Sequence, residues 1–471
     1  MPPILALALT LLFIGFLFRR DYRQGYNPSP ALAIPCIWML ILGSRSVTEW
    51  INLGAPISGG GDVAEGSPLD RTIFFTLMAA GLVVLFRRGV SWSQIFRNNL
   101  ALTLFFVYCG ISIIWSDFPF VAFKRWFKGF GDPIMILIIL TDRDPLRAAE
   151  IVFRVCANIL LPLSVLFIKY YPHLGRTYSE WTGAAAYTGV TTNKNMLGFM
   201  LMVCGLSLVW RIYSRWGVNS GNKIDNVGIP ILLLCMDAWL FQMADSKTSL
   251  MGLLLGILIF TVVGLRTVRT HVTSYLITGM LTFMILQAAF NITELVITSA
   301  GRDTTLTGRT ELWEVVLSMQ QHPIVGFGFD SFWLGDRLKA LQERWYFRPT
   351  QAHSGYIEMY LNLGLVGWLF FAGVIVSCFR KLRTMLTCDA EMTEWVIFGR
   401  FGMAFLGTYL VYNYTEAAFK TPHFLFVIFL LFAIKYAQPR QTLEKISGAG
   451  PPNGAAKAPR LTGVRDVSLA R

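Results

Sequence analysis

Long apolar stretches alternate with short polar stretches along almost the whole chain. A helix needs about 20 mostly apolar residues to cross the hydrocarbon core of a bilayer. The candidate spans are residues 3–18, 31–43, 72–86, 100–116, 131–140, 151–170, 196–213, 228–242, 249–265, 272–291, 356–379, 395–414 and 423–436. Residues 3–18 lack a basic leading segment and a small-residue cleavage site, so we expect a retained anchor. The pattern predicts an all-α, polytopic transmembrane helical bundle of about 12 to 13 spans.

One polar segment is much longer than the others. Residues 292–354 separate two predicted spans, and loops of this length are usually functional or disordered. Inside it, residues 310–321 show a helical apolar period that ends at His322-Pro323. Two interpretations are open: an amphipathic helix on the membrane surface, or a lid over a site. We therefore expect a transmembrane domain over residues 1–436 that contains this loop, followed by a disordered, basic cytoplasmic tail at 437–471.

The composition agrees with a membrane protein, and in a membrane protein the net charge is interpreted by the face on which it lies. The chain has 471 residues, of which 54% are hydrophobic and only 15% charged, against roughly a quarter charged in soluble proteins. The 41 Lys and Arg exceed the 28 Asp and Glu, for a net charge of +13. Basic residues follow alternate spans, which places the N-terminus outside and the C-terminus inside. On that topology the positive excess is on the inner face, so we expect no nucleic-acid partner.

Several common chemistries have no signature in this sequence. No phosphate-binding glycine loop of nucleotide enzymes occurs, and the five histidines lack metal-ligand spacing. We expect no metal and no cofactor. The seven cysteines avoid the predicted outer loops, so no disulfide framework is expected there.

The candidate catalytic residues lie at the membrane mouth of the long loop. His353 stands where the loop re-enters the membrane, and an imidazole there can accept a proton from an attacking hydroxyl. The alternative is a loop histidine bonded to backbone. Gly364 and Gly367 on the next span would let a neighbouring helix approach closely. Glu416, at the end of a span, is a second candidate base or a residue that orients an arginine.

Arginines in the outer segments suggest an anionic ligand. Arg309 opens the loop helix, Arg176 lies in the outer segment 171–195, and Arg125 lies between Lys124 and Lys128. A guanidinium is permanently charged and binds phosphate oxygens in a bidentate manner. These outer cations run against the inward bias of positive charge and favour a ligand such as pyrophosphate. The alternative is ordinary ion pairing, for example with Glu180 or Asp117.

The same residues form motifs that resemble a known family. These motifs are His353-Ser354 followed after nine residues by Gly364-x-x-Gly367, the Gly308-Arg309-Thr-Glu-Leu-Trp313 and His322-Pro-Ile-Val-Gly326-Phe-Gly328 segments, and Thr192-Asn193-Lys-Asn195-Met-Leu-Gly198. Together they resemble the O-antigen ligase / polysaccharide polymerase superfamily of bacterial membrane glycosyltransferases. The motifs cover residues 170–370, whereas the spans before residue 100 match only in hydropathy.

The resemblance implies a metal-independent glycan transfer on the periplasmic face of the inner membrane, in exopolysaccharide or lipopolysaccharide O-antigen biosynthesis. The donor would be a saccharide on undecaprenyl pyrophosphate, and the acceptor a hydroxyl of another glycan. His353 would be the general base, and Arg309 and Arg176 would neutralise the leaving pyrophosphate. Further partners would be membrane lipid and other polysaccharide-assembly proteins.

Three further interpretations remain open at this point. The Ile114-Trp-Ser-Asp-Phe-Pro119 segment slightly favours an exopolysaccharide polymerase over an O-antigen ligase that joins finished polymer to lipid A–core. A flippase or transporter of lipid-linked oligosaccharide would also be polytopic, but the charges inside the spans are few, such as Asp237 and Arg400. A non-enzymatic membrane scaffold is the remaining class.

Overall fold

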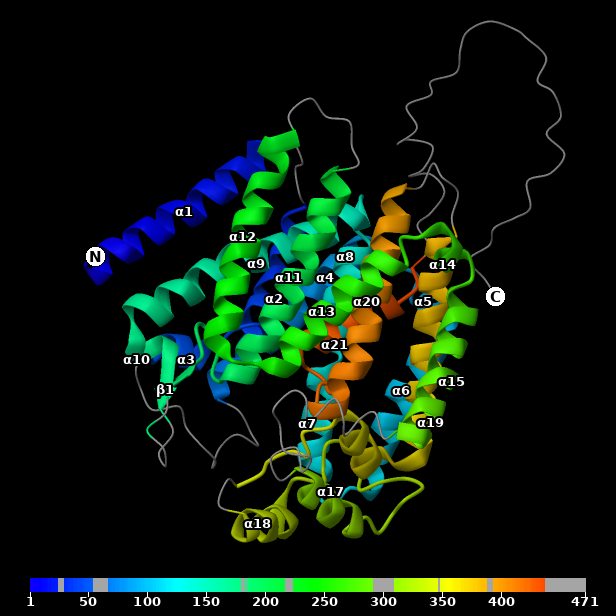
Figure 1. The fold of residues 1–471 in the computed structure, drawn as a ribbon. Coiled ribbons are helices and arrows are strands. Elements are labelled where there is room, and N and C mark those ends of the chain that lie inside the picture. The colour runs from blue at the N-terminus through cyan, green and yellow to red at the C-terminus, as the bar shows by residue number, and fades with distance from the viewer. Residues whose placement is uncertain are drawn as a thin grey trace, which may run out of the picture.

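The fold is a bundle of helices with one small hairpin (Figure 1). The computed structural model describes residues 1–23, 29–53, 67–178, 183, 185–216, 223–290, 309–345, 348–387 and 393–436. The predicted tail at 437–471 and the start of the long loop, 292–308, lie outside these residues.

Helices make up nearly all of the described elements in both halves of the chain. The first half contains α1 (Pro3–Arg23), η1 (Pro30–Leu32), α2 (Ala33–Leu42), α3 (Val47–Ile51), α4 (Pro68–Arg87), α5 (Trp92–Asn98), α6 (Leu100–Ile111), η2 (Ser112–Trp115), α7 (Pro119–Gly129), α8 (Gly131–Leu140), α9 (Pro145–Tyr170), α10 (Pro172–Gly175), β1 (Arg176–Tyr178) and β2 (Ala185–Tyr187). The second half contains α11 (Lys194–Trp216), α12 (Lys223–Ala244), α13 (Lys247–Val262), α14 (Arg266–Thr270), α15 (Val272–Phe290), α17 (Arg309–Ser318), α18 (Gly335–Arg344), α19 (Gly355–Leu386), α20 (Thr393–Thr415) and α21 (Phe424–Ala433).

The all-α, multi-pass architecture is confirmed. Within the described residues, seven helices are long and apolar enough to cross a membrane, or eight if the bent pair Trp92–Asn98 and Leu100–Trp115 is one span. The predicted spans at 31–43, 249–265 and 423–436 form shorter apolar helices of 10–17 residues. Apolar length alone overstates the number of full-length spans, because short apolar helices can be enclosed by protein instead of crossing lipid.

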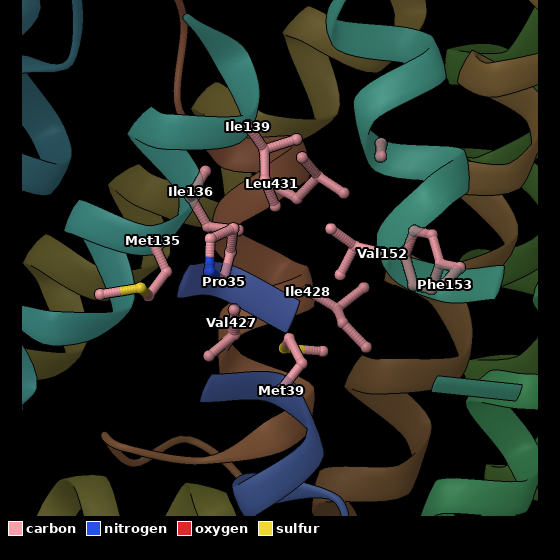
Figure 2. Close-up of a pocket in the computed structure, with 11 residues that line it drawn as sticks. Pro35, Met39, Met135, Ile136, Ile139, Val152, Phe153, Val427, Ile428 and Leu431 are labelled. Carbon is pink, nitrogen blue, oxygen red and sulfur yellow. The ribbon is translucent and has the colours of Figure 1, made fainter. Parts of the chain in front are cut away.

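The C-terminal helices form the centre of the bundle. Every residue of α21 is buried, although this helix has only ten residues. Between α2, α8, α9 and α21 lies an apolar cavity of about 10 Å³, lined by side chains such as Met39, Ile136 and Ile428 (Figure 2). A cavity of this size without polar partners is too small and too apolar to hold water or a substrate. The centre is therefore a packed core.

The two ends of the bundle gather the segments that the charge pattern assigned to opposite faces. At one end, where α7, α17 and α18 lie in Figure 1, Arg125 pairs with Asp330 (3.2 Å) and Arg337 with Asp117 (2.7 Å). At the other, Arg88 pairs with Asp142 (2.9 Å), and Arg154, just inside its predicted span, pairs with Asp21 (3.1 Å). The predicted outer segments thus contact one another, and so do the predicted inner segments. We call these the loop end and the opposite end.

The loop helix is packed against protein. In α17, Leu312 and Val316 are buried in a second apolar cluster with Phe332 of the loop and Leu361 of α19. The apolar face of α17 is therefore not free to lie on lipid. Of the two interpretations, this arrangement fits a cover over the start of α19 better than a helix on the membrane surface.

Candidate active site

His353 is held in a fixed backbone position at the entry to α19. Its φ of 52° is unusual for a residue with a side chain, and such strain persists only where the surroundings hold it. The preceding residue is bonded on both sides: Ala352 N donates to Glu358 Oε1 (2.5 Å), and Ala352 O accepts from Trp313 Nε1 (2.7 Å). The imidazole is 30% exposed, so it remains accessible.

Glu416 brings four distant segments together. It follows α20, and its Oε1 accepts from Arg309 NH2 (3.2 Å) at the start of α17 and from Asn195 Nδ2 (3.2 Å) in the first turn of α11. Its Oε2 lies 3.6 Å from His353 Nδ1. Its backbone carbonyl accepts from Gly355 N (3.1 Å) at the start of α19. We call His353, Glu416, Arg309 and Asn195 the loop-end cluster.

Arg309 is fixed by two acceptors at the end of α20. NH1 donates to Thr415 O, and NH2 donates to Glu416. A cation is favourable at this position because the last carbonyls of a helix carry partial negative charge. A guanidinium has five N–H donors, and these two bonds leave further donors in the same plane. Arg309 can therefore hold Glu416 in place and still bind an anion.

The ring of His353 has polar neighbours on one side. Besides Glu416, Gln351 Nε2 lies 3.3 Å from Nδ1, and Lys420 Nζ donates to Gln351 Oε1 (3.1 Å). Among the described residues, Nε2 of His353 has no hydrogen-bond partner. A carboxylate beside Nδ1 stabilises a ring that has taken up a second proton. In the tautomer that carries its N–H on Nδ1, toward the Glu416 carboxylate and not accepting from Gln351, Nε2 can act as a general base.

Arg176 and Arg125 lie at the same end but do not contact the cluster. Arg176 donates from Nε and NH2 to Ile168 O (3.1 and 2.8 Å) and stacks over Tyr187. Arg125 donates to Asp330 O (2.5 Å) and pairs with the Asp330 carboxylate. For Arg125 the ion-pairing alternative is thus realised, with Asp330 in place of Asp117. Glu180 lies outside the described residues.

The cations beside Arg125 on α7 also contact protein. Lys124 lies over the Phe120 ring (4.8 Å) and Lys128 over Phe74 (4.3 Å). Burial lowers the pKa of the Lys128 ammonium, and the neighbouring Asp70 counteracts that shift. The exposed rings of Phe120, Phe123 and Phe127 leave α7 amphipathic, with aromatic side chains suited to the membrane interface.

The polar residues of the asparagine-rich motif and of the His353-Ser354 motif have two roles. Some belong to the loop-end cluster, and others stabilise the helices that carry it. Asn195 binds Glu416, whereas Asn193 Oδ1 accepts from Met196 N (2.8 Å) and caps the start of α11. Ser354 is buried, and its Oγ lies 3.5 Å from Asn413 O of α20. The asparagine-rich segment therefore starts a helix and at the same time orients the carboxylate.

Gly364 and Gly367 have a different role from the predicted one. Gly364 breaks α19 with a φ of 63°, and a Cβ there would lie 2.3 Å from Ile324 O. A Cβ on Gly367 would lie 2.2 Å from Leu363 Cβ of the same helix. The interpretation as a helix-packing surface is wrong: the two glycines permit a kink. The kink receives the 322–328 segment, since Val366 N donates to Ile324 O and Leu365 N to Pro323 O (both 3.0 Å).

Three residues that the sequence did not single out for a role complete the site. Glu358 accepts from Ala352 N and from Trp333 Nε1 (2.9 Å), so it ties the loop to α19. Gln351 and Lys420 extend the polar contacts of His353. Glu358 had one available signal, its position one helical turn after the His353-Ser354 motif. Gln351 and Lys420 had none, because their contact joins segments 69 residues apart.

Two charges inside the bundle do not pair with each other. Arg400 donates from Nε and NH2 to Phe260 O (3.1 and 2.9 Å) and stacks over Tyr213. Asp237 is fully buried, and neither of its oxygens has a hydrogen-bond partner among the described residues. Among all the residues that the structure describes, no group of three or more potential metal ligands occurs.

Comparison with known proteins identifies similar sequences in polysaccharide assembly. Residues 230–372 match the family described as O-antigen ligase. The exopolysaccharide production protein ExoQ of Rhizobium meliloti is 24% identical over 357 residues, which are 74% of this chain and 79% of that protein. A putative polysaccharide ligase of Rickettsia felis is 20% identical over 336 residues (68% and 77%), and one of Rickettsia bellii is 21% identical over 324 residues (65% and 74%).

These similarities confirm the resemblance that the motifs predicted. The family match contains Arg309, His353 and both glycines of the motif. Glu416 and Asn195 lie outside it in sequence, yet the structure brings Glu416 to His353 and Arg309, and Asn195 to Glu416.

Proposed function

We propose that this multi-pass membrane protein, which resembles the O-antigen ligase / polysaccharide polymerase superfamily, is a glycosyltransferase that acts on saccharides carried by undecaprenyl pyrophosphate. It transfers or polymerises these units onto the hydroxyl of another glycan, on the periplasmic face of the inner membrane, with its C-terminus in the cytoplasm. The observation that carries the proposal is the loop-end cluster, where a base, a carboxylate, a guanidinium and an amide from four segments meet.

The reaction requires one proton acceptor and one anion site. The acceptor oxygen attacks the anomeric carbon, and the bond between that carbon and the pyrophosphate oxygen breaks. The hydroxyl proton passes to Nε2 of His353, while Glu416 stabilises the resulting imidazolium through Nδ1. The bond electrons leave with the pyrophosphate, whose charge needs stabilisation more than it needs a proton.

The anion site is built on Arg309. Its free N–H donors bind phosphate oxygens beside the base, and the exposed Lys420 ammonium adds a second positive charge there. Arg125 and Arg176 serve the same donor in this proposal, as outer contacts along the approach to Arg309. The amphipathic α7 that carries Arg125 suits this task, because it combines cations with exposed aromatic rings at the level where a lipid phosphate lies.

Among the branches of the superfamily, exopolysaccharide polymerisation is favoured. The similarity to an exopolysaccharide production protein covers 74% of the chain, more than either similarity to a putative ligase. The alternative is ligation of finished polymer to lipid A–core. A flippase is disfavoured by Arg400, because its Nε and NH2 both donate to the backbone carbonyl of Phe260 and do not line a charged path. We assign the transferase domain to residues 1–436 and a cytoplasmic tail to 437–471.

A reconstituted assay tests the proposal. The purified chain is supplied with lipid-linked donor and acceptor, and new glycosidic bonds are measured by mass spectrometry. His353→Ala should lower the rate by about 10²- to 10⁴-fold, the usual contribution of a general base. His173→Ala is the matched control, because it removes another exposed histidine, in α10 and outside the loop-end cluster.

Each result of this assay decides between the candidates. A normal rate in His353→Ala would contradict the base assignment. Donor crossing a liposome membrane without any new bond would favour the flippase. Products that lengthen with time indicate a polymerase, whereas a single addition of finished polymer to lipid A–core indicates a ligase.

A further inference from the structure

The end of the bundle opposite the active site contains a second, denser cluster of arginines. Glu150 of α9 lies between Arg147 (2.6 Å), Arg215 (3.0 Å) and Arg211 (3.8 Å), the last two from α11. One helical turn further along α9, Arg154 pairs with Asp21 of α1 (3.1 Å). We call these six residues the opposite-end cluster. It holds four guanidinium groups and two carboxylates, so these six side chains together carry a net charge of +2.

Part of this positive charge has no acceptor. Arg211 is 4% exposed, and its Nε and NH1 atoms make no hydrogen bond within the described residues. The NH1 of Arg154 is likewise buried and unpaired there. An arginine cannot escape this situation by losing its proton, and a buried donor without a partner is unfavourable by about 1–3 kcal/mol. Both observations call for an additional anion with several acceptor oxygens.

An apolar groove lies about two helical turns along α9 from Arg154. It runs between α1, α9 and α12, has a volume of about 210 Å³, and is lined by side chains such as Leu9, Phe13, Pro162, Val165 and Met236. On α9, residues Arg154, Asn158 and Pro162 follow one another at four-residue intervals, so they lie on one side of the helix. Asn158 Nδ2 donates to Asp21 (3.0 Å), between the charged end and the groove.

We infer that this part of the molecule binds an anionic phospholipid, with the phosphate at Arg154 and Arg211 and an acyl chain along the groove. Basic pockets between transmembrane helices are a known setting for anionic head groups. The dimensions agree, because Phe13 lies about 12 Å along α1 from Asp21, well within the length of an acyl chain. A phosphate supplies the oxygens that the unpaired N–H groups need. The site is separate from the glycan chemistry and stands without it.

Binding is measured by native mass spectrometry on the full chain, titrated with phosphatidylglycerol, phosphatidylcholine or inorganic phosphate. We expect retention of phosphatidylglycerol, at least tenfold weaker binding of phosphatidylcholine, and no protection from thermal unfolding by inorganic phosphate. Arg211→Gln should weaken phosphatidylglycerol binding about tenfold, the loss expected for a hydrogen bond to a charged group. Arg380→Gln, an exposed arginine outside the cluster, is the matched control and should bind normally.

A second pair of variants tests the groove without touching the charges. Leu9→Trp fills the groove and should weaken lipid binding, whereas Leu12→Trp on the outer side of α1 should not. If Arg211→Gln does not fold, the inference is tested by this pair of variants and by the comparison of the two lipids in the natural chain. Equal affinity for both lipids, equal binding by each variant and its control, or equal protection by inorganic phosphate would overturn the inference.

Discussion

The two arginine–carboxylate clusters of this protein contain the same functional groups but differ in what surrounds them. At the loop end, one guanidinium and one carboxylate accompany an imidazole that is 30% exposed on a strained backbone. At the opposite end, four guanidinium groups surround two carboxylates, and none of these six residues is a histidine. The difference teaches that an arginine cluster alone does not indicate catalysis. An accessible proton acceptor beside the arginine does.

Removal of the carboxylate charge from the loop-end cluster should have a large effect on activity. Glu416→Gln keeps the shape of the side chain but no longer stabilises an imidazolium, and we expect the rate of transfer to fall about 10- to 100-fold. Asp330→Asn is the control, since it removes a loop-end carboxylate that pairs with Arg125 and not with His353. An equal loss of rate in both variants would show that the total charge at the loop end matters and that Glu416 has no specific role beside His353.

Loss of the Glu358 carboxylate, which ties the loop to α19, should lower the stability of the protein more than the rate of transfer. Glu358→Ala leaves the Ala352 and Trp333 N–H groups without their acceptor, and each such loss is unfavourable by about 1–3 kcal/mol. Thermal unfolding in detergent should show a clear fall in the midpoint. Glu343→Ala, a carboxylate on α18 with no described bond to α19, should leave the midpoint almost unchanged. If both variants unfold like the natural chain, Glu358 does not anchor the loop.

The kink in α19 should tolerate no side chain. In Gly364→Ala, the Cβ meets the backbone of Ile324 and the residue is forced to a positive φ, a strain of about 1–3 kcal/mol. The matched variant Gly373→Ala lies in the same helix, where a Cβ meets only the Ala101 methyl at 3.7 Å. Only the first should unfold at a lower temperature. A stable Gly364→Ala protein would show that the 322–328 segment does not depend on the break.

The smallest effect on stability is expected at Arg125. Its ion pair with Asp330 is partly exposed, and such pairs contribute about 0–1 kcal/mol. Arg125→Gln should therefore unfold almost normally, while it raises the KM for the lipid-linked donor if the residue is an outer contact for phosphate. An unchanged KM would remove Arg125 from the donor site.

The sequence predicted the members of the loop-end cluster better than their arrangement. His353, Arg309 and Asn195 belong to short motifs, and motifs indicate residues independently of geometry. Glu416 was expected as a base or as an orienting group, and it contacts the imidazole, Arg309 and Asn195. Arg176 shows what the sequence could not predict. Its side chain donates to Ile168 O, and this contact depends on the conformation of the local turn and not on the residue type.

The fold shows the same limit. Hydropathy predicts the all-α, multi-pass class, but α21 is fully enclosed with ten residues, and apolar length cannot distinguish enclosure from a membrane crossing. The role of Gly364 was missed because spacing shows where glycines lie but not the φ that each adopts. The contact of Gln351 with Lys420 joins distant segments, and such contacts are set by tertiary packing.

The coupling between His353 and Glu416 tests the central claim most directly. Rates of glycosidic bond formation are measured for His353→Ala, Glu416→Gln and the double variant. Residues that act as one unit in the transition state are strongly non-additive. We predict that the double variant is no slower than His353→Ala alone. A double variant slowed by the product of the two single effects would contradict a shared role in proton transfer.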